Sequence, residues 1–199
     1  TGDTIIIDGG DEPQRLIDWI ESFSGNGPDW STGPSTLEEA SDAGIPKRKV
    51  VALVNTHAHF DHSGFIPVLK AHYGVDWFLH PDDTMLQTLA KKSGMRYGLQ
   101  LPEPAEADHA LVASQWHSFG SIALQVLHTP GHTLGGCCLL IEVNDEANHV
   151  FVGDTLFDST NLGPVEPPFL GKIPSLLATS EYASVKLPRS LRNTSLSNF

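Results

Sequence analysis

Three histidines and one aspartate occupy a stretch of only six residues, at His57, His59, Asp61 and His62. Imidazole nitrogens and carboxylate oxygens are donors that zinc binds in proteins, so the cluster indicates a metal site. Alternate side chains of an extended segment project the same way, and His57 and His59 can therefore hold one ion together. Asp61 and His62 come where the chain turns into the next element and point elsewhere. The spacing predicts two adjacent metal positions rather than one.

Two later segments carry further candidate donors. His132 follows a Pro-Gly pair, which fixes a sharp turn and would aim the imidazole. Asp154 stands at the end of an apolar run, where a lone aspartate would more often be a turn or capping residue. Together with the other two segments it becomes a candidate bridging carboxylate. His128, at the end of an expected strand, is interpreted as a packing or supporting residue rather than a ligand.

Apolar runs directly precede each of these three segments, and short runs of this kind are typical of buried strands. A strand that ends in a loop of ligands presents metal at the rim of a sheet. The pattern predicts strands over residues 4–7, 50–55, 76–80, 121–128, 137–143 and 149–152, with a hairpin turn at 144–148. Helical spacing of apolar residues predicts helices over 13–23, 65–73 and 81–92. Residues 24–47, 93–109 and 158–199 show neither pattern clearly.

Length and composition limit the classes of protein and partner. A chain of 199 residues suits one domain, and we expect residues 1–199 to form it, with residues 158–199 irregular. The chain opens in the middle of a pattern, so we expect truncation at one or both ends. The net charge of −12 disfavours nucleic acid as partner, and no apolar run approaches the roughly 20 residues of a membrane span. Cys137 and Cys138 are adjacent and would face opposite sides of a strand, which disfavours a disulfide between them. Two free thiols favour a reducing compartment, such as the cytoplasm or an organelle matrix.

The segments at 56–62, 127–136 and 151–157 resemble those of the metallo-β-lactamase-fold hydrolases, most of all the hydroxyacylglutathione hydrolase (glyoxalase II) branch. The resemblance runs from about Thr4 to Phe157. It implies an α/β fold, the αβ/βα sandwich of two mixed β-sheets with outer helices and metal at one edge.

Carried over by position, the resemblance also implies a set of metal ligands. The first ion would be bound by His57, His59 and His132, the second by Asp61 and His62, and both by Asp154. Asp8, at the end of the first strand, would support the site from behind, although a turn residue is the alternative. The implied cofactor is Zn²⁺, two ions per chain, with iron as the other option.

The implied activity is hydrolysis of a small-molecule thioester or ester, with water activated by the metals and Asp61 orienting it. The carboxylate at Asp154 argues against a true β-lactamase, and the acidic chain argues against a nuclease. The sequence contains no Ser-His-Asp or Cys-His signature that would indicate a protein nucleophile.

Two departures from the family pattern keep other functions open. The family offers one more histidine after the bridging aspartate, but the last histidine here is His149, which precedes Asp154. We therefore expect weaker binding at the second position. The helical region that holds glutathione in glyoxalase II is not recognisable in residues 158–199. One alternative is a persulfide dioxygenase with a single Fe²⁺ on His57, His132 and Asp154. The other is a metal-binding scaffold without activity.

Overall fold

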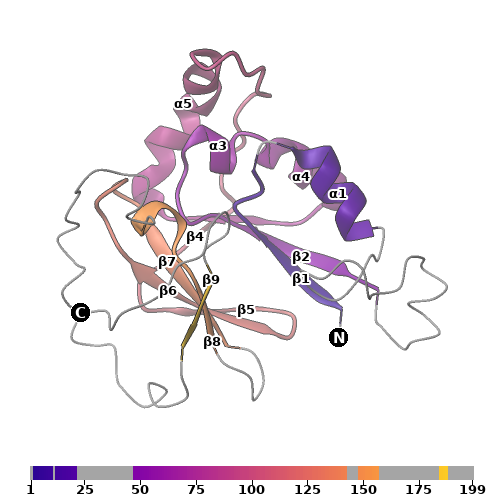
Figure 1. Cartoon of the computed structure of the whole chain (residues 1–199), viewed down its shortest axis with the longest axis vertical. Coiled ribbons are helices and arrows are strands. Elements are labelled where there is room, and N and C mark those ends of the chain that lie inside the picture. Colours follow the sequence, from indigo (N-terminus) through magenta and orange to yellow (C-terminus); the bar gives the residue numbers. More distant parts are fainter. Residues whose placement is uncertain (1, 11, 22–46, 143–147, 157–183, 188–199) are drawn as a thin grey trace.

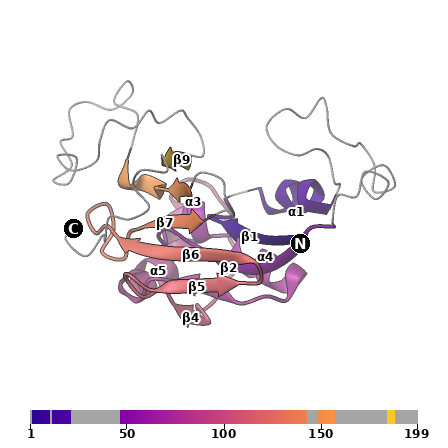
Figure 2. The same ribbon diagram turned by 90° about the horizontal axis from the view of Figure 1, so that it is seen from below.

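The computed structural model describes residues 2–10, 12–21, 47–142, 148–156 and 184–187. These residues form a four-stranded sheet, a five-stranded sheet and the helices that cover them. The helices lie on one face of the first sheet, and the second sheet lies on its other face (Figures 1 and 2). None of the described helices is long and apolar enough to cross a membrane.

The first sheet is parallel and has the order β1-β2-β3-β4. Its strands are β1 (Asp3–Ile7), β2 (Lys49–Val54), β3 (Trp77–Leu79) and β4 (His109–Ala110). Parallel neighbours need crossover connections, and helices lie in them along the chain. These helices are α1 (Pro13–Glu21), α3 (Phe60–Ser63), α4 (Ile66–Tyr73), the 3₁₀ turn η1 (Pro81–Asp83) and α5 (Thr84–Met95).

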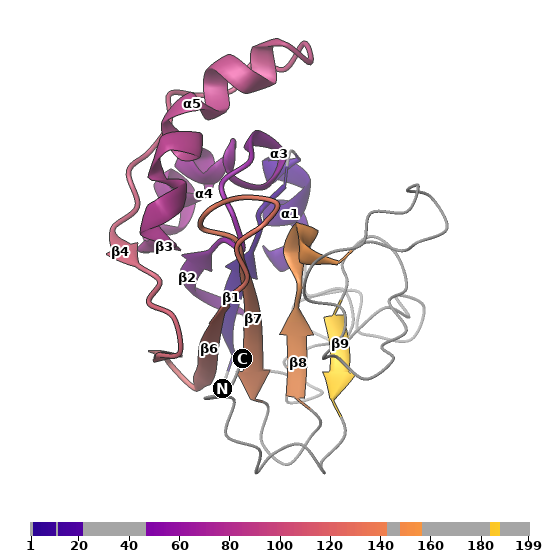
Figure 3. The same cartoon turned by 90° about the vertical axis from the view of Figure 1, so that its left-hand side faces the viewer.

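The second sheet is antiparallel, with the order β5-β6-β7-β8-β9. Figure 3 shows β6 to β9 side by side. Its strands are β5 (Trp116–Phe119), β6 (Ile122–His128), β7 (Cys137–Glu142), β8 (Asn148–Phe151) and β9 (Ser184–Leu187), and the 3₁₀ turn η2 (Gly153–Thr155) follows β8. Each sheet was expected to be mixed. Among the described strands each sheet has a single kind of pairing, because helices separate the strands of the first sheet and short links join β5 to β8 in the second.

Two apolar layers flank the central strand β2, which is buried on both faces as parallel strands usually are. Leu53 packs towards the helices, whereas Ala52 and Val54 pack towards the second sheet. The helix-side layer includes Ile17, Ile20, Ile66, Leu69 and Trp77. The layer between the sheets includes Leu111, Leu124, Val126, Cys137 and Leu139. The end of β2, where the histidine cluster begins, is therefore held from both sides.

Most expected elements that fall on described residues are present with ends shifted by a residue or two. The helix expected over 81–92 is a 3₁₀ turn followed by α5, which continues to Met95. Strand β5 was not expected, and its first three residues are not buried, so they carry little apolar signal. Cys137 and Cys138 are buried free thiols, as expected. The turn at 144–147 and most of residues 24–47 and 158–199 lie outside the described residues.

The helix-side layer gives a test of the fold. Leu53 is fully buried, so Leu53→Ala should lower the free energy of unfolding by about 2–5 kcal/mol. Urea denaturation monitored by circular dichroism measures this change. The matched control is Met85→Ala on α5, where the side chain is 70% exposed. A loss in the control as large as that in Leu53→Ala would contradict this packing.

Asp108 joins α4 to β3, because its carboxylate accepts hydrogen bonds from Lys70 Nζ at 2.6 Å and from the Trp77 amide at 2.7 Å. Burial opposes ionisation, but the two bonds outweigh it and hold the pKa of Asp108 below its ordinary value of 3.8. The stabilisation is therefore present above that ordinary value and is lost as the pH falls through the lower pKa of the folded state.

Asp108→Asn should accordingly reduce stability at neutral pH by about 1 kcal/mol or less, since the pair is partly exposed to solvent. The difference between the variant and the wild type should shrink towards about pH 3, where the unfolded carboxyl is protonated. Urea unfolding of both proteins at the two pH values measures it. A difference that grows in acid would be the wrong sign for this assignment.

Candidate metal centre

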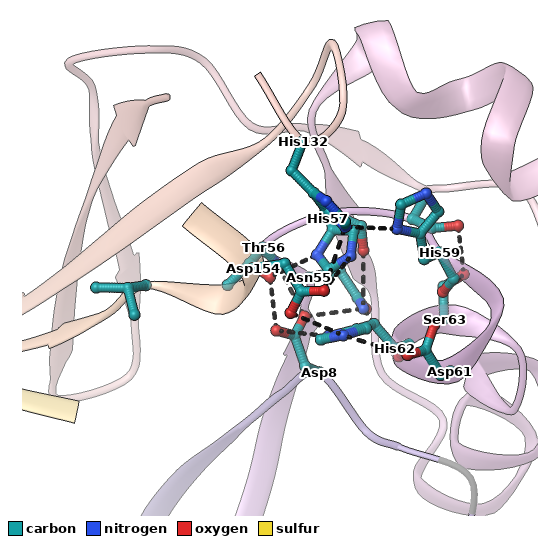
Figure 4. Close-up of polar contacts among 12 residues, drawn as sticks. Asp8, Asn55, Thr56, His57, His59, Asp61, His62, Ser63, His132 and Asp154 are labelled. Carbon is teal, nitrogen blue, oxygen red and sulfur yellow. Dashed lines mark hydrogen bonds and ion pairs between the residues drawn. The ribbon is translucent and has the colours of Figure 1, made fainter. Parts of the chain in front are cut away.

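Four donors from three separate segments converge at the edge of the sheets (Figure 4). His57 and His59 follow β2, His132 lies in the loop between β6 and β7, and Asp154 lies on η2. One nitrogen or oxygen of each lies within 4.8 Å of the others. His132 Nε2 is 2.9 Å from His59 Nδ1 and 3.2 Å from Asp154 Oδ2. Donors of a tetrahedral zinc site, each about 2.0–2.2 Å from the ion, lie at comparable separations.

A second group is formed by Asp8, His57 and His62. His62 Nδ1 is 3.2 Å from Asp8 Oδ2, and its Nε2 is 3.4 Å from Asp154 Oδ1. The two oxygens of Asp154 thus face different partners, Oδ2 towards His132 and Oδ1 towards His62. This is the orientation that a bridging carboxylate needs.

Asp61 lies at the edge of the site and belongs to neither group. Its side chain is 54% exposed, and its Oδ2 is 3.7 Å from His62 Nε2. The structure therefore brings together five of the six residues expected as ligands, and leaves Asp61 on the solvent side of them.

Asp8 lies behind the site, at the end of β1, with the left-handed backbone angle φ of 48°. Its carboxylate accepts hydrogen bonds from the Thr56 amide at 2.8 Å, the Thr56 hydroxyl at 2.6 Å and the Asn55 side-chain amide at 3.0 Å. Asp8 therefore fastens the end of β1 to the start of the histidine loop. The expectation of a supporting acid at this position agrees with these contacts.

Thr56 connects Asp8 to His57 and selects the tautomer of the histidine. The Thr56 hydroxyl donates its hydrogen to Asp8, so it can only accept from His57 Nδ1, which is 3.1 Å away. His57 Nε2 then carries a lone pair. Burial, helped by the nearby His62, lowers the pKa of His57 to about 3, which keeps the ring neutral.

The same nitrogen, His57 Nε2, is buried without a hydrogen-bond partner among the described residues and is 4.0 Å from Asp154 Oδ2. A buried polar atom without a partner is costly and demands an explanation. A neutral imidazole lone pair that faces a carboxylate and a second histidine fits a metal ion, because metals bind the deprotonated nitrogen.

His62 has the opposite electrostatic environment. Burial would lower its pKa, but hydrogen bonds with Asp154 and Asp8 outweigh burial and raise the pKa of His62 to about 10. The carboxylates of Asp8 and Asp154 therefore favour positive charge at the position of the His62 ring.

Asn55 was not singled out from the sequence, and it supports both groups. Its side-chain amide donates to Asp8 and to the His62 carbonyl at 2.9 Å, and its oxygen accepts from the Trp77 indole at 3.0 Å. Asn55 is fully buried, so a polar residue directly after an apolar strand was the signal that could have revealed it.

His128 lies outside both groups, as expected for a supporting residue. Its ring stacks on His80 with centroids 4.2 Å apart and an interplanar angle of 12°, and its Nε2 is 2.9 Å from the Leu134 carbonyl. His80, Asp82 and His128 also bring one donor each within 4.8 Å. The lone pairs of two stacked, nearly parallel rings lie in separate planes, however, and do not converge on one ion.

Comparisons with known proteins agree with this geometry. A family model described as the metallo-beta-lactamase superfamily matches residues 1–187. An uncharacterized protein of Aquifex aeolicus (strain VF5) is 30% identical over 158 residues, which cover 79% of this chain and 61% of that protein. The hydroxyacylglutathione hydrolase GloC of Haemophilus influenzae is 28% identical over 160 residues, which cover 76% of this chain and 60% of GloC. The chain thus spans about three fifths of the length of these curated relatives.

A similar solved structure is the crystal structure of TTHA1623 in a di-iron-bound form. It is 28% identical, with a TM-score of 0.53 over 81% of this chain and 68% of that chain.

The ligand assignment can be tested by a pair of histidine variants. His132→Ala should lose most of the bound metal, because it removes a donor from the four-residue group. His128→Ala should keep the metal, since this ring faces His80 and the Leu134 carbonyl instead. Metal content per chain after gel filtration gives the answer. Equal loss in the two variants would refute the assignment.

Proposed function

This chain belongs to the metallo-beta-lactamase superfamily, and from that premise we propose that it is a metal-dependent hydrolase acting on a thioester or ester. The observation that carries the proposal is the buried lone pair of His57, which faces His132 and Asp154 at one edge of the fold. A hydrolase of this kind needs such a cluster of deprotonated donors where substrate can reach it.

In the proposed site the first ion would be held by His57, His59 and His132. The second would be held by Asp61 and His62, and Asp154 would serve both. Zn²⁺ is the proposed metal. When bound, such ions bring the pKa of water close to neutrality and polarise a carbonyl oxygen.

The side chains around the site have matching tasks. Asp61, on the solvent side, accepts a hydrogen bond from the attacking water and orients it. Asp8 and Thr56 hold the His57 ring in the tautomer whose Nε2 faces the site. Asp154 keeps the two groups at a fixed separation because its oxygens contact His132 and His62.

The nearby hydroxyl and thiol groups are poor nucleophiles, which supports water as the attacking group. The Ser63 hydroxyl contacts the carbonyl oxygens of Ala58 and His59. Burial, followed by the neighbouring Cys138, raises the pKa of Cys137 to about 12, so this thiol stays protonated near neutral pH.

The substrate class rests on the relatives. GloC, named as a hydroxyacylglutathione hydrolase, is similar over 76% of this chain. A thioester is therefore the substrate class that we propose first.

A specific observation favours the iron-dependent alternative as the second candidate. The relative TTHA1623 has been crystallised in a di-iron-bound form. His57, His132 and Asp154 form a two-histidine, one-carboxylate set here, the type of site that non-haem Fe²⁺ oxygenases use. A persulfide dioxygenase would use this set alone.

Metal content and turnover distinguish the candidates. Protein purified without chelators should contain about two zinc ions per chain. It should hydrolyse S-lactoylglutathione, lose this activity on chelation and regain it with Zn²⁺. His132→Ala is the inactive control. One iron per chain with oxygen uptake on glutathione persulfide would favour the dioxygenase. Full metal content without turnover of thioesters, esters or persulfides would contradict both and leave a scaffold.

A further inference from the structure

Asp83 is fully buried although it is a carboxylate, and no lysine or arginine in the described part of the chain forms an ion pair with it. Asp83 is the N-cap residue of α5, a position at which aspartate usually accepts a hydrogen bond from the first turn of its own helix. Its side chain makes no such bond. The carboxylate instead bonds to two loops that are distant in sequence.

The first loop is the histidine cluster. Asp83 Oδ2 accepts a hydrogen bond at 3.0 Å from the backbone amide of Ala58. Ala58 is fully buried and stands between His57 and His59 in the chain. A hydrogen bond at this amide therefore fixes the backbone that carries both histidines.

The second loop is the one that carries His132. Asp83 Oδ2 accepts at 2.9 Å from the hydroxyl of Thr133, and Oδ1 accepts at 2.7 Å from the amide of Gly135. Thr133 is the direct neighbour of His132 and is itself buried. One carboxylate thus bonds next to all three histidines of the four-donor group.

Gly135 shows how closely this loop approaches Asp83. A Cβ atom added at Gly135 would lie 2.8 Å from Asp83 Cγ and 2.8 Å from the Asp83 amide nitrogen. Real Cβ atoms essentially never approach other heavy atoms so closely, so the contact requires glycine here.

A backbone bond also joins the two segments, from the Cys137 amide to the Thr56 carbonyl at 2.9 Å. This bond fixes the strand ends, whereas Asp83 reaches residues that adjoin the histidines.

We propose that Asp83 is a positioning residue, which holds the His57–His59 loop and the His132 loop at the separation at which they share one ion. The inference rests on the metal site of the proposed function.

Asparagine at this position keeps the size of the side chain but cannot satisfy all three donors. One of its two terminal groups is an amide that donates, so it must face either the Ala58 amide and Thr133 hydroxyl or the Gly135 amide. At least one buried amide or hydroxyl then loses its acceptor, and the loop that carries it shifts or loosens. The donors of the ion would be displaced although none of them has been changed.

The experiment is a titration of the metal-free protein with Co²⁺, followed by its visible absorption spectrum, in the wild type and Asp83→Asn. We expect Asp83→Asn to bind Co²⁺ about 10- to 100-fold more weakly, the range found when supports of metal ligands are removed. The matched control is Asp82→Asn, the preceding residue, whose side chain is 58% exposed. The control should bind Co²⁺ as the wild type does.

Thermal unfolding of each metal-free variant separates positioning from a purely structural role. A lower melting temperature for Asp83→Asn with an unchanged Co²⁺ affinity and spectrum would overturn the proposal. If Asp83→Asn does not fold, Thr133→Val decides, because it removes a single hydrogen bond at similar volume. Gly135→Ala would place a methyl group against Asp83 and so disturb the contact between Asp83 and the His132 loop. This variant should also weaken Co²⁺ binding.

The two proposals fail in different ways. A wild-type chain that binds no Co²⁺ would overturn the metal site and the role of Asp83 with it. If the wild-type chain binds Co²⁺ and Asp83→Asn binds it with unchanged affinity, only the role of Asp83 is overturned. If Asp83→Asn is unfolded, unchanged Co²⁺ affinity in both Thr133→Val and Gly135→Ala overturns it instead.

Discussion

The hydrogen bonds of Asp8 to Thr56 are the interaction on which the geometry of the site depends. Parallel pairing of β1 with β2 brings the ends of these strands to the same edge of the sheet, and Asp8 joins them there. The same carboxylate contacts His62, and through Thr56 it determines which nitrogen of His57 is free. A single acid behind the site thus orients one histidine of each donor group.

The two sheets supply different parts of the site because their connections differ. In the parallel sheet, the crossover after β2 carries the histidine cluster, with His57 and His59 in the short segment 55–59 and His62 on α3. Short connections of the antiparallel sheet bring His132 and Asp154 to the same edge from neighbouring segments. The apolar layer around Ala52, Val54 and Leu139 holds the sheets face to face. Donors that are distant in sequence therefore meet in space.

The sequence was most informative where chemistry and periodicity coincide. Apolar runs predicted the strands before each donor segment. The spacing of the histidines predicted two positions, and the structure forms two groups of donors that share His57, with Asp8 rather than Asp61 in the second. Strand β5 was missed because most of its residues are not buried and pairing alone defines it. Asp83 was not singled out within the helix expected over 81–92, because its contacts lie 25 and 52 residues away and the local pattern carries no trace of them.

The spread of the donors along the chain has a consequence for the stability of the folded state. His57 follows a strand of the first sheet and Asp154 follows a strand of the second, and roughly a hundred residues separate them, so an ion held by both would close a very large loop. Such a cross-link restricts the opened chain far more than it restricts the native one. An occupied site would therefore shift the equilibrium away from the opened chain, and the two sheets would come apart more rarely while the cation is held.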